Sequence, residues 1–99
     1  IAIPSYGHAG DGNIHTRLVK NPDWSLQQWN ETLPKVLDEL YRLTASLGGR
    51  ISGEHGIGHK RKKHMPLFVS AEYIDMLRAV KRALDPNGVL NPGKIFDLP

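Results

Sequence analysis

Apolar residues at helical spacing, closed by two glycines, are the feature that most constrains how this chain can fold. They recur over residues 31–47 and predict an amphipathic helix with one buried face. The positions are Leu33, Val36, Leu37, Leu40, Thr44 and Leu47. Pro34 fits only in the first turn of such a helix, where its missing N–H removes no hydrogen bond. Gly48-Gly49 predicts the end of the helix.

Two strands are predicted before this helix and one after it. Residues 1–6 and 14–19 are rich in β-branched, aromatic and leucine side chains and flank a glycine-rich turn. Residues 50–52 form a short predicted strand after the paired glycines. The order of strands and helix predicts an α+β fold, a fragment of an antiparallel sheet with helices packed on one face.

Two further helical signals lie on either side of this region. Ser25 and Gln28 have capping-box spacing, which predicts a short helical turn before the long helix. A later helix is predicted from Ser70, its N-cap, to about Leu84, and a turn over residues 85–88 ends it. Its inward side is expected to carry Ile74, Leu77, Val80, Lys81 and Leu84.

Size and composition restrict the possible chemistry. The chain has 99 residues, enough for one modest core, and no cysteine, so a metal would be held by His, Asp or Glu. It begins at Ile1 inside a predicted strand, and we expect a piece of a longer protein. No apolar run approaches the ~20 residues that cross a bilayer, and no basic-then-apolar leader is present. These features predict a cytoplasmic protein without a transmembrane segment.

Basic residues are concentrated in one short segment. The net charge is only +3, but the four residues from Lys60 to Lys63 are all basic, with His59 and His64 on either side. No aromatic side chain is interleaved with them, which argues against a nucleic-acid partner. Two interpretations stay open: the solvated face of a short helix, or a patch that attracts an anionic substrate or a cofactor phosphate.

The stretch YGHAGDGNIH places His8 and His15 on either side of a Gly-Asp-Gly-Asn core. If Asp11-Gly12 forms a two-residue hairpin turn, His8 lies directly opposite His15, with Cβ atoms ~4.5–5.5 Å apart. A turn shifted by one residue would break that pairing. Two imidazoles placed face to face in this way could bind a single divalent ion.

A histidine pair needs a further ligand, commonly a carboxylate, to hold a catalytic ion with an open position. Glu54 is the main candidate, because neighbouring glycines let the backbone aim its side chain unusually. Asp11 is the competitor, although a turn position gives it an ordinary structural role. A site of His8, His15 and Glu54 is therefore weighed against an ordered turn and a solvated Glu-His pair.

Three motifs, in this order, resemble a known family. GHAGDGNIH, SGEHGIG and VLNPGKIF are similar to the C-terminal part of the FAD-linked oxidases and dehydrogenases of D-2-hydroxy acids. This vanillyl-alcohol-oxidase group includes glycolate oxidase, D-lactate dehydrogenases and D-2-hydroxyglutarate dehydrogenase. The resemblance covers nearly the whole chain. It implies a ferredoxin-like cap domain on the substrate side, with residues 85–99 returning toward an FAD-binding domain that lies upstream and outside this chain.

The resemblance also implies roles for individual residues. His8, His15 and Glu54 match the ligands of a divalent metal, often Zn. His55 matches the proposed catalytic base. Asn91, in the last motif, matches a position close to the flavin.

Two positions bear on the substrate. Some relatives have an Asn that touches substrate two residues after the second histidine, where this chain has Arg17. The basic residue expected after the second motif would be Lys60 or Arg61. These three side chains are the candidate substrate contacts, and the departure at Arg17 leaves the substrate range open.

The implied activity is the FAD-dependent oxidation of a D-2-hydroxy acid, of the glycolate or D-lactate type, to the 2-keto acid. FAD, bound mainly by the upstream domain, accepts the hydride, the metal orients the substrate, and His55 removes the hydroxyl proton. The expected partners are the small-molecule acid, the upstream FAD-binding domain and electron-transfer subunits, through which the protein would associate with a membrane. The fragment alone is expected to be inactive.

Two other classes stay open. A metal-dependent hydrolase could use the same three ligands with His55 as base, and it would turn over an ester or amide without flavin. A non-catalytic module would bind no metal and would use the basic segment to bind an anion or a partner surface.

Overall fold

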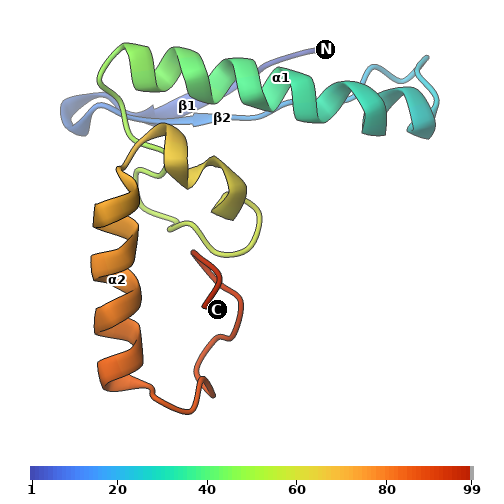
Figure 1. The fold of residues 1–99 in the computed structure, drawn as a ribbon. Coiled ribbons are helices and arrows are strands. Elements are labelled where there is room, and N and C mark those ends of the chain that lie inside the picture. The colour runs from blue at the N-terminus through green and yellow to red at the C-terminus, as the bar shows by residue number, and fades with distance from the viewer. Residues whose placement is uncertain (99) are drawn as a thin grey trace. The chain divides into compact units, whose positions relative to one another are not determined.

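The computed structural model describes residues 1–98; Pro99, the last residue of the predicted segment 85–99, lies outside them. The chain forms two compact units, Ile1–Leu40 and Tyr41–Pro99. The elements in chain order are β1 (Ser5–His8), the 3-10 helix η1 (Ala9–Asp11), β2 (Asn13–Thr16), α1 (Leu26–Ser46), the 3-10 helix η2 (Lys62–Leu67) and α2 (Ala71–Leu84) (Figure 1). An antiparallel strand pair together with helices confirms the predicted α+β class.

The two predicted N-terminal strands are present in shortened form. β1 and β2 pair antiparallel, with Tyr6 opposite His15. Beyond this ladder an isolated bridge joins Ala2 to Val19, so the two segments run side by side over most of the predicted length. The β-branched and aromatic content therefore predicted the strands, while the regular hydrogen bonding is confined to their ends nearest the turn.

The turn between the strands is longer than predicted. Ala9–Asp11 form a 3-10 turn, closed by a hydrogen bond from the Gly12 N–H to the Ala9 oxygen at 3.3 Å. Gly12 has a φ of 66°, a conformation that costs a residue without Cβ nothing. Because the connection includes this extra turn, His8 lies opposite Asn13. The predicted two-residue turn, with the two histidines directly opposite each other, is wrong.

Gly7 lies where the facing strand leaves no room for a side chain. A Cβ on Gly7 would lie 1.9 Å from the backbone oxygen of Asn13, and a backbone atom cannot move aside as a side chain can. We expect Gly7→Ala to force the strands apart and to destabilise the protein by roughly 1–3 kcal/mol, the usual cost of overpacking. Gly10→Ala is the matched control, since its Cβ would meet nothing within 4 Å. Thermal melts measure both, and equal melting temperatures would contradict the observed register.

α1 begins earlier than predicted. The Ser25 hydroxyl accepts a hydrogen bond from the Gln28 N–H at 3.1 Å, which confirms the predicted cap. The helix then runs without a break from Leu26 to Ser46, so the capped turn and the long helix are one element. Pro34 therefore lies inside the helix, and its predicted place in the first turn is wrong. An interior proline removes one backbone donor and crowds a carbonyl of the preceding turn, a cost of about 3 kcal/mol that the rest of this 21-residue helix offsets.

The paired glycines end α1 as predicted. Gly48 has a φ of 78°, its N–H donates to Ala45 at 3.0 Å, and the Gly49 N–H donates to Thr44 at 2.9 Å. This pair of bonds is the Schellman motif. The strand predicted over residues 50–52 is wrong, because within residues 1–98 only β1 and β2 form a sheet. A strand exists only where a neighbouring backbone accepts its hydrogen bonds.

α2 has the predicted start and end. The Ser70 hydroxyl caps it by accepting from the Tyr73 N–H at 3.1 Å. Its predicted inward side is confirmed at Ile74, which is buried, and wrong at Val80 and Leu84, which are 53% and 80% exposed. Leu77 and Lys81, on the same predicted side, are half-buried. None of the helices in residues 1–98 has the length and apolar character needed to cross a membrane.

The core of the second unit lies where η2 meets the start of α2. Met65 and Ile74 are buried there, and His64 beside them is 5% exposed. The Tyr41 ring lies 4.5 Å from the His64 ring and 6.1 Å, edge-on, from Phe68. His64 therefore belongs to the aromatic core, although in the sequence it directly follows the basic residues Lys60 to Lys63.

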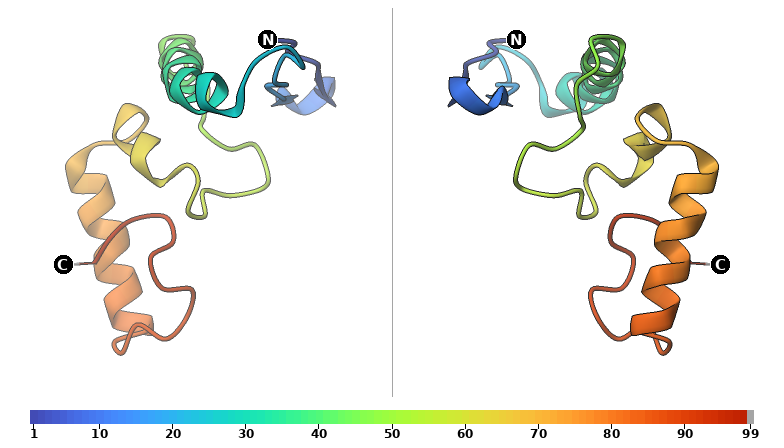
Figure 2. Two further views of the ribbon diagram at one scale, coloured as in Figure 1. Left: turned by 90° about the vertical axis from the view of Figure 1, so that its right-hand side faces the viewer. Right: turned by 90° about the vertical axis from the view of Figure 1, so that its left-hand side faces the viewer.

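The C-terminal residues turn back along α2 (Figure 2). Asp85 forms the corner and is only 6% exposed. Its carboxylate accepts hydrogen bonds from the N–H groups of Val89 at 3.1 Å and Leu90 at 3.0 Å, and it forms an ion pair with Lys81. Lys81 also donates to the Leu90 oxygen at 2.6 Å. The Asp85–Lys81 ion pair thus binds both backbone groups of Leu90: Asp85 accepts from its N–H, and Lys81 donates to its C=O.

This corner makes stability depend on pH. The hydrogen bond from Lys81 and those from the Leu90 and Val89 N–H groups lower the pKa of Asp85. A carboxyl whose pKa is lowered by folding stabilises the fold at pH values above its pKa in the unfolded chain, about 3.9. This stabilisation is lost as the pH falls through the lower pKa of the folded protein. We expect Asp85→Asn to lower the melting temperature at pH 7 and to match the wild type near pH 2.

Thermal melts across that range, with Asp75→Asn as control, test this expectation. Asp75 also pairs with a basic side chain of α2, Arg78 at 2.9 Å, but its own side chain is 71% exposed. An exposed pair contributes little, so the control should stay close to the wild type at every pH. A deficit of Asp85→Asn that is as large at pH 2 as at pH 7 would show that charge is not its cause.

Candidate functional site

The two motif histidines lie on one face of the hairpin. Residues directly opposite each other share a face, and so do alternate residues of one strand. Tyr6, His8, Asn13 and His15 therefore share one side of the β1–β2 pair. His8 and His15 are diagonal neighbours, a relation in which backbones lie ~7–8 Å apart and long side chains still meet. The His15 ring stacks on Tyr6 with centroids 5.0 Å apart, which limits its orientation.

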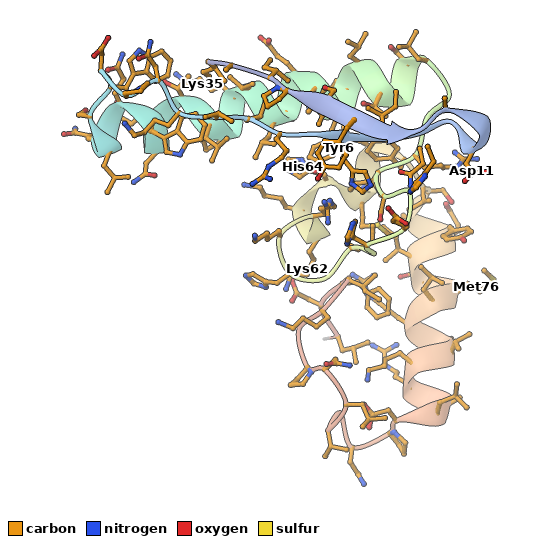
Figure 3. All side chains as sticks on the ribbon, turned by 180° about the vertical axis from the view of Figure 1, so that it is seen from behind. Tyr6, Asp11, Lys35, Lys62, His64 and Met76 are labelled. Carbon is orange, nitrogen blue, oxygen red and sulfur yellow. The ribbon has the colours of Figure 1, made fainter. Side chains whose placement is uncertain are left out.

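Asp11, the alternative carboxylate, lies in η1 at the turn (Figure 3). The last paired residues of the ladder are His8 and Asn13, so Asp11 is outside the paired strands. Its position agrees with the structural role expected of a turn aspartate, and it leaves Glu54 as the carboxylate of interest.

Glu54 and His55 lie in a bent, glycine-rich loop between α1 and η2. Glu54 Oε1 is 3.8 Å from His55 Nε2, and the two side chains are 46% and 67% exposed. Gly56 and Gly58 take φ values of 79° and 58°, and the Gly56 N–H donates to the Ser52 hydroxyl at 2.8 Å. In an extended chain neighbouring side chains point apart. The bend that the glycines allow lets the side chains of Glu54 and His55 approach each other.

The basic segment does not form one solvated face. Arg61 donates to the Gly56 oxygen at 3.0 Å, so it braces the loop that carries His55. Lys62 has a side chain that is 20% exposed and pairs with Asp97 at 2.7 Å. The solvated-face interpretation is therefore wrong for these two residues. Lys60 and Lys63 are exposed.

The intramolecular contacts of Arg61 and Lys62 are ones that the sequence did not indicate. Arg61 was a candidate substrate contact, and a carbonyl five residues away already accepts one of its donors. A guanidinium has five N–H donors, so others are left for an anion. Arg17, the other arginine among the candidates, follows directly after β2 and is exposed.

Asn91 lies in the left-handed region, with a φ of 45°. Asn tolerates this conformation better than most residues, which fits an Asn at this point of the tail. The residue is exposed and directly follows Leu90, whose N–H and C=O are held by Asp85 and Lys81. Its backbone is thus fixed while its side chain stays accessible.

The sequence that forms the hairpin, the acid-histidine loop and most of the tail matches a known family. The family model for FAD linked oxidases, C-terminal domain, matches residues 1–95. The chain belongs to this family, which confirms the family that the three motifs predicted.

Individual relatives narrow the comparison. Glycolate oxidase subunit GlcD of Bacillus subtilis (strain 168) is 38% identical over 99 residues, 97% of this chain and 20% of that protein. D-lactate dehydrogenase of Anaerostipes hadrus is 38% identical over 93 residues, 94% of this chain and 19% of that protein. D-2-hydroxyglutarate dehydrogenase of Stutzerimonas stutzeri (strain A1501) is 34% identical over 91 residues, 92% of this chain and 20% of that protein. The chain spans about a fifth of the length of these relatives.

Proposed function

We propose that this chain is the substrate-side, C-terminal part of a longer FAD-dependent enzyme that oxidises a D-2-hydroxy acid to the 2-keto acid. The observation that carries the proposal is the family match over residues 1–95. Glycolate, D-lactate and D-2-hydroxyglutarate, which appear in the names of the relatives, are all 2-hydroxy acids. In this proposal the FAD-binding domain precedes the chain, and residues 85–99 return toward it. Cytoplasmic location and electron-transfer subunits stay predictions.

The proposed metal ligands are His8, His15 and Glu54, with Zn as the first metal to test. Imidazole nitrogen and carboxylate oxygen form a usual donor set for catalytic Zn, which keeps one position open. The donors suit this role: the histidines share one face of the hairpin, and the Glu54 side chain is 46% exposed. A bound metal would supply polarisation of the substrate hydroxyl.

His55 is the proposed general base. Histidine is the side chain that most often takes this role, and His55 is the more exposed partner of the Glu54–His55 pair. In the proposed reaction its imidazole accepts the hydroxyl proton of the acid. The flavin, when bound, accepts the hydride from the α-carbon.

The acid substrate also carries a carboxylate. Arg17 and Lys60 are exposed cations, and Arg61 keeps donors beyond the one bound to Gly56. A carboxylate is well matched by such groups, and arginine can bind it through two parallel hydrogen bonds. These three residues are therefore the proposed substrate contacts.

Anaerobic flavin reduction tests the proposed function. The full-length protein is mixed with glycolate, D-lactate or D-2-hydroxyglutarate, and the flavin absorbance is followed, with L-lactate as the stereochemical control. We expect bleaching by at least one of the three acids and none by L-lactate. A full-length protein that binds no FAD, or whose flavin none of these acids reduces, would contradict the proposal. Membership of an FAD-linked family argues against the hydrolase alternative.

A further inference from the structure

The last residues of the tail form a strap, residues 91–97, that lies beside Lys62 (Figure 3). The Lys62 ammonium donates to the Gly93 oxygen at 3.0 Å and to the Asp97 carboxylate at 2.7 Å. The Asp97 backbone oxygen accepts a further bond from Arg78 at 2.8 Å. Lys62 thus binds this strap at two points, and Arg78 holds its far end.

A pocket lies between part of the strap and apolar residues of η2 and α2. This pocket, of about 190 Å³, is partly open to solvent, and its lining includes Met65, Ile74, and Ile95 and Phe96 of the strap. Lys62 and Arg78 also line it, so their hydrogen bonds to the strap are formed beside this pocket.

Ile95 in the strap has an unusual backbone. Its φ is 70°, a value that a β-branched residue adopts only as an outlier. Such a conformation persists where surrounding contacts impose it. Here the Ile95 N–H donates to the Gly58 oxygen at 2.7 Å, and Gly58 is itself in the left-handed region.

The Ile95–Gly58 bond links the two candidate functional segments of the second unit. Gly58 ends the glycine-rich loop that carries Glu54 and His55, and the strap begins at Asn91. Because Gly93 and Asp97 flank Ile95 in the chain, the contacts of Lys62 hold Ile95 in place from both sides.

We propose that Lys62 is a positioning residue, which holds the strap against the glycine-rich loop and so fixes Asn91 relative to His55. This proposal rests on the proposed function, in which Asn91 in the strap lies close to the flavin and His55 in the loop accepts the proton. Proton and hydride leave neighbouring atoms of one substrate, so both acceptors must be held in place. A misplacement of 1 Å can slow such a reaction about 10²-fold.

The charge of Asp97 supports this role. Its side chain is 80% exposed, yet Lys62 lowers its pKa by hydrogen bonding and by charge, with smaller contributions from Arg78 and His59. The carboxylate is therefore ionised over the whole range in which a flavoenzyme would work, and the contact between strap and η2 is charge-assisted at these pH values.

The test uses the full-length protein with three variants. Lys62→Met removes both bonds, Lys62→Arg keeps a cation that can donate to both acceptors, and Lys63→Met is the matched control with the same charge change at an exposed neighbour. Asp97→Ala removes only one of the bonds from an exposed side chain, in case Lys62→Met does not fold. All measurements are made well below the melting temperature of each variant.

The first readout is hydrogen exchange of peptides that cover residues 93–97 and so include the Ile95 amide. We expect Lys62→Met to exchange at least about 10-fold faster there, because opening of the strap exposes a bonded N–H. The second readout is anaerobic flavin reduction, which should slow by roughly 10-fold to 10²-fold with FAD and metal contents unchanged. Lys62→Arg should restore most of both, and Lys63→Met should match the wild type.

The outcomes separate the two proposals. Unchanged exchange in Lys62→Met, or faster exchange with an unchanged rate of flavin reduction, would overturn the positioning role of Lys62. A wild-type protein that no 2-hydroxy acid reduces would overturn the proposed function instead, while the exchange experiment would still decide whether Lys62 holds the strap.

Discussion

His55→Ala should slow reduction of the flavin in the full-length protein by roughly 10²–10⁴-fold, the usual loss when a general base is removed. The imidazole is the proposed acceptor of the hydroxyl proton, and methyl cannot replace it. Metal content should stay that of the wild type, because His55 is not among the proposed ligands. Stopped-flow absorbance under anaerobic conditions, run beside elemental analysis, measures both quantities.

His59→Ala is the matched control for this substitution. His59 follows the same glycine-rich loop and is exposed, so the variant removes an imidazole nearby without touching the proposed base. It should reduce flavin at close to the wild-type rate. If His55→Ala reduced flavin as fast as the wild type across neutral pH, the base assignment would be wrong, and His55 would have to act by orienting Glu54, from which it is 3.8 Å away.

Local signals in the sequence predicted the helices well. The Ser70 cap and the Schellman end at Gly48-Gly49 are formed by residues within a few positions of one another, so their chemistry can be read from a short window. The early start of α1 could have been found in the same way. Leu26 and Trp29 continue the helical spacing of Leu33 toward the N-terminus, and the Ser25 cap lies directly before them.

Register and long-range contacts were harder to predict. The hairpin register depended on whether Asp11-Gly12 or a longer connection makes the turn, and both are compatible with the same glycine-rich letters. The contacts of Lys62 join residues 31 and 35 positions apart, so nothing near Lys62 in the chain could indicate them. The run of basic residues suggested a solvated surface, whereas Lys62 within it binds Gly93 and Asp97 of the strap.

The candidate site residues could be proposed from the sequence because they lie within three short motifs. Two histidines around a turn, and an acid-histidine pair among glycines, needed only residue identity and spacing. The positions of these side chains relative to one another could be determined only from the three-dimensional structure. The diagonal relation of His8 and His15, and the 3.8 Å approach of Glu54 to His55, both follow from backbone conformations at glycines that the sequence allowed but did not specify.

Glu54→Gln should remove the metal from the full-length protein, and with it the activation of the substrate. The amide keeps the shape of the side chain but lacks the negative charge that makes a carboxylate a good ligand for a divalent ion. We expect metal content to fall from about one ion per chain to well below that, since ligand loss in a three-residue site removes much of the binding free energy. Elemental analysis after dialysis measures this directly.

Asp11→Asn is the matched control for Glu54→Gln, because it makes the same kind of change at the alternative carboxylate, which lies in the turn outside the paired strands. It should keep its metal. If Asp11→Asn lost the ion and Glu54→Gln retained it, the ligand role would belong to the turn. Compared with His55→Ala, which should keep metal but lose rate, Glu54→Gln should lose both. The variants of these two adjacent residues should therefore differ in metal content. If Glu54→Gln and His55→Ala lost metal equally, Glu54 and His55 would share a single role.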